Sequence, residues 1–190
     1  MVLNSSVLYE YARNAKLYRL DESVNFTANS VFDSSANYDV FISHSFDDRD
    51  KVLGLRTLFN QCGYKVYVDW IDDANLDREH VTSDTANVIR ERIKQSKSLA
   101  LIVTSNSSDS KWCPWELGYS DGYNGKTCVL PIFDHDYYKG QEYLGLYPFI
   151  DFARNNKTNK EELWVNDPHD SRKYLSLREW LKGEKMKVHY

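Results

Sequence analysis

The chain has few of the residues that mark exported, metal-binding or membrane-spanning proteins. Its 3 cysteines, Cys62, Cys113 and Cys128, are odd in number and show no CxxC or Cys/His spacing. They are typical of reduced thiols rather than of a disulfide framework or a zinc site. No stretch approaches the roughly 18 apolar residues that span a bilayer, and no basic segment followed by an apolar run opens the chain. We therefore expect a cytoplasmic protein without a membrane segment or a secretion signal.

Basic residues are not concentrated anywhere in the chain. The net charge is −4 and no Lys/Arg tract is present, which argues against nucleic acid as a partner. Hydrophobic and charged fractions of 42% and 27% are those of a soluble globular protein. Aromatic residues are plentiful instead, with 14 tyrosines and 5 tryptophans. They would allow stacking on a planar ligand, although most should serve the core.

The central part of the chain alternates between short apolar strands and amphipathic helices. We predict strands at 38–43, 65–69, 98–104, 127–133 and 147–152. Helices are expected at about 48–62, 82–96, 111–124 and 171–182. Strands separated by helices predict a mostly parallel, five-stranded sheet covered on both faces, which is a flavodoxin-like three-layer α/β sandwich.

Residues 1–36 form a separate piece, and residues 37–190 form the main domain. Ser5 or Ser6 is expected to cap a helix that runs through Leu20. Its apolar stripe is predicted to consist of Val7, Tyr11, Ala15 and Tyr18. A polar, turn-rich linker follows, so the chain is predicted to be one α/β domain with an N-terminal helical extension.

The segment from Ser110 to Tyr119, SKWCPWELGY, contains the most informative carboxylate of the chain. Residues three and four apart share a helix face, so Trp112, Trp115 and Tyr119 are expected to surround Glu116. A carboxylate among aromatic rings is partly desolvated, which makes it a candidate for chemistry. The alternative is a boundary glutamate that covers the rings with its methylenes and keeps its oxygens in water.

Polar residues follow the first two predicted strands, where parallel sheets bind their ligands. The first strand leads into Ser43, His44, Ser45 and Phe46, and the second leads into Asp69 and Trp70. The carboxyl ends of parallel strands share one edge of the sheet. We therefore expect these side chains and Glu116 to line one cleft.

Three segments together resemble the signature segments of a Toll/interleukin-1 receptor (TIR) domain. They are YDVFISHSFDDRD, YKVYVDW with its acidic loop, and SLALIVTSNSSDSKWCPWELGY, in the matching order and spacing. The resemblance covers about residues 37–133 and extends plausibly to Lys182. The S-x-W-C-x-x-E pattern around Trp112 and Glu116 is its most specific part.

The resemblance implies an enzyme rather than an adaptor. In TIR domains that act on NAD⁺, a glutamate at the place of Glu116 is catalytic, and the chain is similar to the bacterial TIR proteins of Thoeris anti-phage defence. It implies a hydrolase that cleaves the nicotinamide–ribose bond of NAD⁺ and makes an ADP-ribose-derived signalling nucleotide, read by a separate effector. NAD⁺ would be its substrate, with no cofactor and no metal. Self-association into a homo-oligomer is a further expectation.

Two features depart from the family pattern. His44, Ser45 and Phe46 stand where some eukaryotic NAD-cleaving members have arginines, and the loop from Trp70 to Val81 lacks the glycine that many members have. The resemblance therefore does not assign the residues that would hold the phosphates and the adenine.

A single carboxylate suits this chemistry. Nicotinamide leaves NAD⁺ as a neutral molecule and needs no general acid, so Glu116 could position the ribose hydroxyls and stabilise positive charge at C1′. Trp112 would offer a flat surface to a ring, and Ser43, His44 and Ser45 would bond the carboxamide or the ribose. An imidazole can exchange a proton near neutral pH, but His44 could equally be a strand-end histidine bonded to backbone. Water, an internal hydroxyl or an external nucleophile would each give a different product.

Two other functions stay open at this point. One is a non-enzymatic signalling module that self-associates through the loop from Trp70 to Asp84. The other is an enzyme resembling a nucleoside deoxyribosyltransferase. The spacing of Asp73, Asn75, Asp77 and Asp84 also imitates a calcium loop, but Arg78 occupies the glycine position, so we expect an acidic solvated loop and no calcium.

Overall fold

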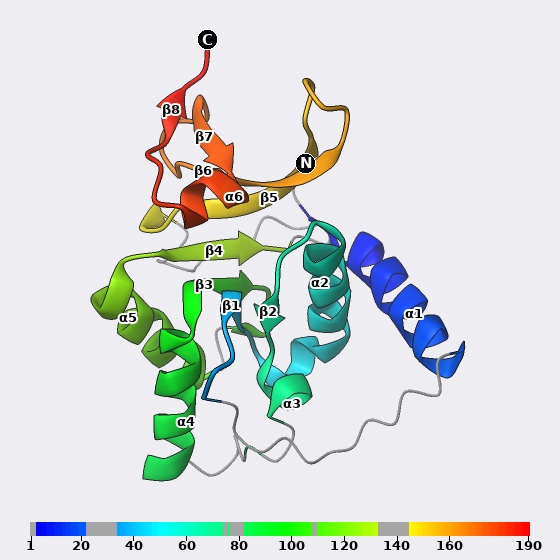
Figure 1. Cartoon of the computed structure of the whole chain (residues 1–190), viewed down its shortest axis with the longest axis vertical. Coiled ribbons are helices and arrows are strands. Elements are labelled where there is room, and N and C mark those ends of the chain that lie inside the picture. Colours follow the sequence, from blue (N-terminus) through cyan, green and yellow to red (C-terminus); the bar gives the residue numbers. More distant parts are fainter. Residues whose placement is uncertain (1–2, 22–33, 74–75, 77–81, 108–109, 133–144) are drawn as a thin grey trace.

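In a computed structural model of the protein, the described residues are 3–21, 34–73, 76, 82–107, 110–132 and 145–190, with only the backbone considered for 16–21. An 8-stranded sheet in the order β2-β1-β3-β4-β5-β6-β7-β8 forms the centre (Figure 1). The predicted linker over 22–33 and the predicted strand end at Phe133 lie outside these residues.

The first part of the sheet is parallel, as predicted. It consists of β1 (Tyr38–Ser43), β2 (Val66–Tyr67), β3 (Ser96–Val103), β4 (Thr127–Pro131) and β5 (Phe149–Arg154). β1 lies between β2 and β3, so the strand order reverses beside β1. In open α/β sheets this reversal point is where ligands bind, at the carboxyl ends of the strands.

The second part of the sheet is antiparallel and exceeds the predicted five strands. β6 (Glu161–Asn166), β7 (Lys173–Ser176) and β8 (Lys187–Val188) extend it from β5. The predicted helix over 171–182 is wrong in its first half, because only α6 (Leu177–Leu181) is helical, with a capping box between Ser176 and Glu179. Pairing of β7 with β6 sets Tyr174 edge-to-face on Trp164, with ring centroids 5.6 Å apart. Such cross-strand packing outweighs a weak helical pattern.

Helices cover both faces of the parallel part, which confirms the three layers. α2 (Arg49–Gln61) lies on one face, with α1 (Ser5–Asp21) packed against it (Figure 1). α4 (Ser83–Lys94) and α5 (Trp112–Asn124) lie on the other. Both faces of β3 are therefore buried, which accounts for its continuous apolar run.

The apolar core fills both spaces between sheet and helices. Val52, Leu55 and Phe59 of α2 and Ile89 and Ile93 of α4 are buried, as their spacing predicts. Neither Cys62 nor Cys113 nor Cys128 forms a disulfide, and burial raises the pKa of the Cys128 thiol. Among the described residues, no helix is long and apolar enough to cross a membrane.

The N-terminal helix exists as predicted, but its cap and its buried face differ. Asn4 caps it instead of Ser5 or Ser6, because its Oδ1 accepts from the N–H of Val7 at 3.0 Å. Leu8 and Ala12 are buried, whereas Tyr11 and Ala15 are half-buried and the side chain of Tyr18 lies outside the described set. The buried stripe is thus rotated by one residue, toward the close approach of α1 and α2.

Gly54 permits this approach, since a Cβ added there would overlap the carbonyl oxygen of Leu8. We expect Gly54→Ala to lower the free energy of unfolding by about 1–3 kcal/mol, because the two helices must move apart. Urea denaturation would measure it. Gly122→Ala is the control, because a Cβ there meets nothing within 4 Å. This variant should raise the free energy of unfolding by about 0.5–1 kcal/mol, since alanine favours the helix more than glycine does. Equal stability of the two variants would contradict the packing of α1 on α2.

Candidate functional site

Several residues of the predicted site lie at the carboxyl edge of the parallel strands, beside the reversal of strand order, together with Thr104. Ser43 is the last residue of β1, Asp69 follows β2 after Val68, and Thr104 follows β3 directly. Each is buried. The edge expected from the sheet topology is therefore polar and lies beneath the surface.

Glu116 is the centre of this edge. It lies in the second turn of α5, has an exposed fraction of 0%, and its Oε2 accepts a hydrogen bond from the Ser43 hydroxyl at 2.6 Å. Two segments separated by 73 positions in the sequence thus meet at one carboxylate. Hydrogen bonds to a charged oxygen are the strong ones, so Ser43 holds one carboxylate oxygen in a defined direction.

The aromatic residues around Glu116 are arranged differently from the single stripe that the spacing predicts. Glu116 belongs to the inward face of α5, with Cys113, Leu117 and Ser120. Trp112, Trp115 and Tyr119 are half-buried along the flank of the helix. Trp112 and Trp115 lie edge-to-face at 5.5 Å, and Trp115 and Tyr119 stack at 5.8 Å. The glutamate therefore points toward the sheet, because Ser43 is its partner there.

His44 is buried between two oxygen atoms. Its Nδ1 lies 3.1 Å from the carbonyl oxygen of Ile42, and its Nε2 lies 3.5 Å from Oδ1 of Asp69. A neutral imidazole can donate to only one acceptor, whereas a protonated ring donates to both. His44 thus has the backbone contact that one reading of the sequence predicts, and it also lies beside the Asp69 carboxylate.

The outer rim of the site is aromatic and basic. Phe46 is 58% exposed, and the Arg49 guanidinium carbon lies 3.8 Å from the centre of its ring and 5.4 Å from that of Trp70. The indole N–H of Trp70 is buried, and no acceptor for it exists among the described residues. Ser45, the residue before Phe46, is buried. Arg49 was missed from the sequence because a single arginine in a helical first turn carries no motif.

Asp48 was also missed, since its position predicts a helix cap. Its side chain makes no capping hydrogen bond to α2. The buried carboxylate instead accepts from the Thr104 hydroxyl at 2.6 Å and from Nδ2 of Asn106 at 2.9 Å. Both partners lie in the segment that leads to α5, so only the fold reveals this role.

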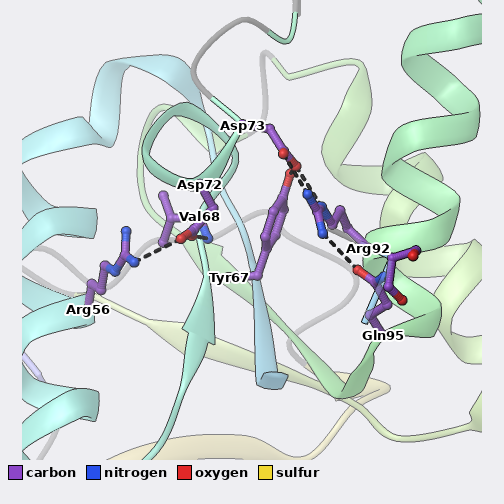
Figure 2. Close-up of polar contacts among 8 residues, drawn as sticks. Arg56, Tyr67, Val68, Asp72, Asp73, Arg92 and Gln95 are labelled. Carbon is purple, nitrogen blue, oxygen red and sulfur yellow. Dashed lines mark hydrogen bonds and ion pairs between the residues drawn. The ribbon is translucent and has the colours of Figure 1, made fainter. Parts of the chain in front are cut away.

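The short helix α3 (Asp69–Asp72) is held from two sides (Figure 2). On one side, Asp72 accepts from Arg56 of α2 at 2.9 Å and from the N–H of Val68. On the other, Arg92 of α4 donates two hydrogen bonds to Asp73, at 2.6 and 2.7 Å. These contacts fix the turn that carries Asp69 and Trp70.

Tyr67 completes the buried pair of Arg92 and Asp73. Its hydroxyl donates to Oδ2 of Asp73 at 2.8 Å (Figure 2). Burial and then the nearby carboxylates raise the pKa of Tyr67 well above its usual value, so the hydroxyl remains a donor. Asp73 is thus engaged by Arg92 and Tyr67. Asn75 and Asp77 of the calcium-like spacing lie outside the described residues, among which no cluster of metal-ligating side chains is found.

Two cavities in the described part of the chain lie away from Glu116. One of about 470 Å³ is bordered by α2 and Ile71, and one of about 1060 Å³ is bordered by the β5–β7 strands. Glu116 borders neither cavity, and its carboxylate has no exposed surface. A ligand can reach the Glu116 carboxylate only when the wall, meaning the residues that cover this carboxylate, opens.

Comparison with known proteins adds to this geometry. A family model described as TIR domain matches residues 40–164. A probable 3′ cyclic ADP-D-ribose synthase ThsB′ of Bacillus cereus (strain MSX-D12) is 46% identical over 154 residues, which are 79% of this chain and 78% of that protein. A putative cyclic ADP-D-ribose synthase TIR2 of Cytobacillus dafuensis is 42% identical over 84 residues, 44% of this chain and 22% of that protein.

Several chains of solved structures are also similar. The TIR domain of the Toll-related receptor TRR-2 of Hydra magnipapillata aligns with 57% of this chain and 78% of that one, at 19% identity and a TM-score of 0.42.

The buried pair beneath the site leads to a stability prediction. Arg92→Leu should lower the free energy of unfolding by about 3–5 kcal/mol, because it leaves the Asp73 carboxylate buried without its cation. Tyr67→Phe removes only one donor and should cost about 1 kcal/mol. Chemical denaturation would measure both. Lys94→Ala is the control, since its pair with Glu91 is exposed, and it should have no measurable effect. A loss for Arg92→Leu no larger than for Lys94→Ala would show that the buried pair does not stabilise α3.

Proposed function

Because the chain belongs to the TIR-domain family, we propose that it cleaves the nicotinamide–ribose bond of NAD⁺ and makes a cyclic ADP-ribose. The observation that carries the proposal is the buried Glu116, whose carboxylate accepts a hydrogen bond from Ser43 at the carboxyl edge of the sheet. The names of the two curated relatives support cyclic ADP-ribose as the product class.

Glu116 would be the catalytic carboxylate. Departure of neutral nicotinamide leaves positive charge on the ribose near C1′, and a carboxylate beside it stabilises that charge most strongly where water is excluded. Glu116 has no exposed surface, so its surroundings already exclude water. Ser43 would hold the carboxylate in a fixed direction toward the ribose.

Buried surroundings also favour cyclisation over hydrolysis. If the wall closes again on the bound nucleotide, a ribose hydroxyl of the same molecule competes with few water molecules for C1′ and loses its proton as nicotinamide leaves. The nucleophile is then already bound, and its effective concentration is high. Exclusion of water thus supports a cyclic product, and its isomer would follow from the hydroxyl that reaches C1′.

The neighbouring residues would bind the substrate. His44 and Ser45, buried next to Ser43, are suited to the carboxamide or the ribose, with His44 oriented by Asp69. Trp112 would offer a ring surface one turn before Glu116. Each of these roles rests on position in the fold and on side-chain chemistry.

The rim would hold the other end of NAD⁺. Phe46 exposes a ring face, and Arg49 supplies a cation beside it. The buried indole N–H of Trp70 can donate to a ligand oxygen. This combination suits an adenosine and a diphosphate, and it supplies the cation that the segment from His44 to Phe46 lacks.

The biological setting follows from the same family. We propose that residues 37–190 act as the TIR domain, with residues 1–36 as an extension packed on α2. The protein would work in the cytoplasm in anti-phage defence of the Thoeris type, and a separate effector would read its product. Assembly into a homo-oligomer would open the wall over Glu116.

The closed wall also favours a second candidate, a TIR module that signals through self-association without catalysis. It predicts no nicotinamide release even at high protein concentration.

Glu116→Gln tests the leading proposal. Gln can still accept from Ser43, so the variant should fold, but without the negative charge its rate of nicotinamide release should fall at least about 100-fold. Release from NAD⁺ would be followed by chromatography, and mass spectrometry would identify the other product. Glu91→Gln, an exposed glutamate of α4, should retain the wild-type rate. Activity in Glu116→Gln equal to that of the control would reject Glu116 as the catalytic carboxylate.

The rim can be tested separately. Phe46→Ala removes a stacking interaction with the substrate that is worth about 1 kcal/mol. It should raise KM for NAD⁺ about fivefold with little change in kcat. Tyr123→Ala removes a similarly exposed aromatic ring from the far end of α5 and should leave both constants unchanged. Steady-state kinetics of the two variants decides the point. An unchanged KM in Phe46→Ala would remove this residue from the binding site.

A further inference from the structure

The segment from Ser43 to Asp48 is attached at both of its ends to the segment that runs from β3 into α5. At one end, Ser43 donates to Glu116 at 2.6 Å. At the other, Asp48 accepts from Thr104 at 2.6 Å and from Asn106 at 2.9 Å. This segment, attached at both ends, contains the predicted site residues of the first loop. They are Ser43, His44, Ser45 and Phe46.

Both carboxylate oxygens of Asp48 take part in this attachment. Its side chain has an exposed fraction of 0%, and Lys51, one turn further along, contacts Oδ1 at 3.2 Å and balances its charge. Aspartate at the start of a helix ordinarily accepts from the backbone of the first turn. Here the helix lacks that bond, and both carboxylate oxygens face the neighbouring loop instead.

Thr104 is the hydrogen-bond donor to Asp48 on the β3–α5 segment. It follows the last residue of β3 and is buried, with an exposed fraction of 3%. Its hydroxyl donates to Asp48 and at the same time accepts from the N–H of Asn106 at 3.0 Å. The Ser107 hydroxyl closes the same turn, because it bonds both the N–H and the carbonyl of Thr104. The path toward α5 is therefore fixed at its first residues.

We propose that Asp48 and Thr104 are a positioning pair for Glu116, an inference that rests on the proposed NAD⁺ cleavage. Neither residue touches the substrate. Their hydrogen bond sets the β1–α2 segment against the β3–α5 segment, and this alignment brings the Ser43 hydroxyl to the Glu116 carboxylate. Without it, Asp48 keeps only one of its two donors from the β3–α5 segment, Asn106, and the two segments can shift against each other. Small displacements of a catalytic group lower the rate steeply.

Thr104→Val tests the pair with a change of minimal shape. The valine fills the same space but cannot donate to Asp48. We expect kcat for nicotinamide release to fall about tenfold or more, with KM for NAD⁺ changed less than about threefold, because the rim that binds the substrate is intact. Thr104→Ser keeps the hydroxyl and should restore kcat to within about threefold of wild type.

Thr57→Val is the matched control for a purely structural effect. The Thr57 hydroxyl also donates a hydrogen bond, to the carbonyl of Leu53 at 2.9 Å, but it lies two turns along α2. Thermal unfolding of each variant would accompany the kinetics, which are run well below every melting temperature. If Thr104→Val lowers the melting temperature as Thr57→Val does but keeps the wild-type kcat, the pair is structural and the inference is wrong.

Two further results keep the test decisive. Should Thr104→Val fail to unfold cooperatively, Asn106→Ala removes the other donor to Asp48 from a half-buried position, and the same loss of kcat is expected. Unchanged kcat in that variant would overturn the inference. A wild-type protein that releases no nicotinamide would instead reject the proposed function itself, which separates the two failures.

Discussion

The site depends on the hydrogen bond that joins the Ser43 hydroxyl to the Glu116 carboxylate. It connects the end of β1 to the second turn of α5 across a buried edge of the sheet, 2.6 Å from oxygen to oxygen. A fully buried carboxylate is costly unless polar partners hold it. Ser43, at the end of β1, is such a partner. The loops at this edge of the sheet are kept in place by the Asp48–Thr104 hydrogen bond and by the anchored turn α3. Stability and the candidate chemistry thus use one set of contacts.

Much of the fold was predictable because it rests on local patterns. The continuous apolar run of β3 indicates a strand buried on both faces, and Gly125, at φ 63°, closes α5 where Asn124-Gly125 predicts its end. The strands beyond β5 could not be predicted in the same way. Lys173–Ser176 is short and half-polar, and only its pairing with β6 makes it a strand. Such pairing is decided by the facing strand and leaves little periodicity within the short strand itself.

The candidate site divides in a similar way. Glu116 and Ser43 were predictable, because motif spacing and the rule for parallel sheets both lead to the same edge. The direction of Glu116 was not, since the spacing of the aromatic residues suggests a shared face, whereas the carboxylate turns inward to Ser43. Arg49 and Asp48 acquire their roles from partners elsewhere in the chain, Phe46 and Trp70 for one and Thr104 for the other. No local pattern contains that information.

The proposed function requires NAD⁺ to react at Glu116. The most direct measurement is a crystal structure of Glu116→Gln with intact NAD⁺ bound. We expect the wall over position 116 to be open, with C1′ of the nicotinamide ribose against that side chain and the adenine toward Phe46. A dinucleotide bound in the cavity beside Trp164 and Tyr174, with position 116 still closed, would contradict it.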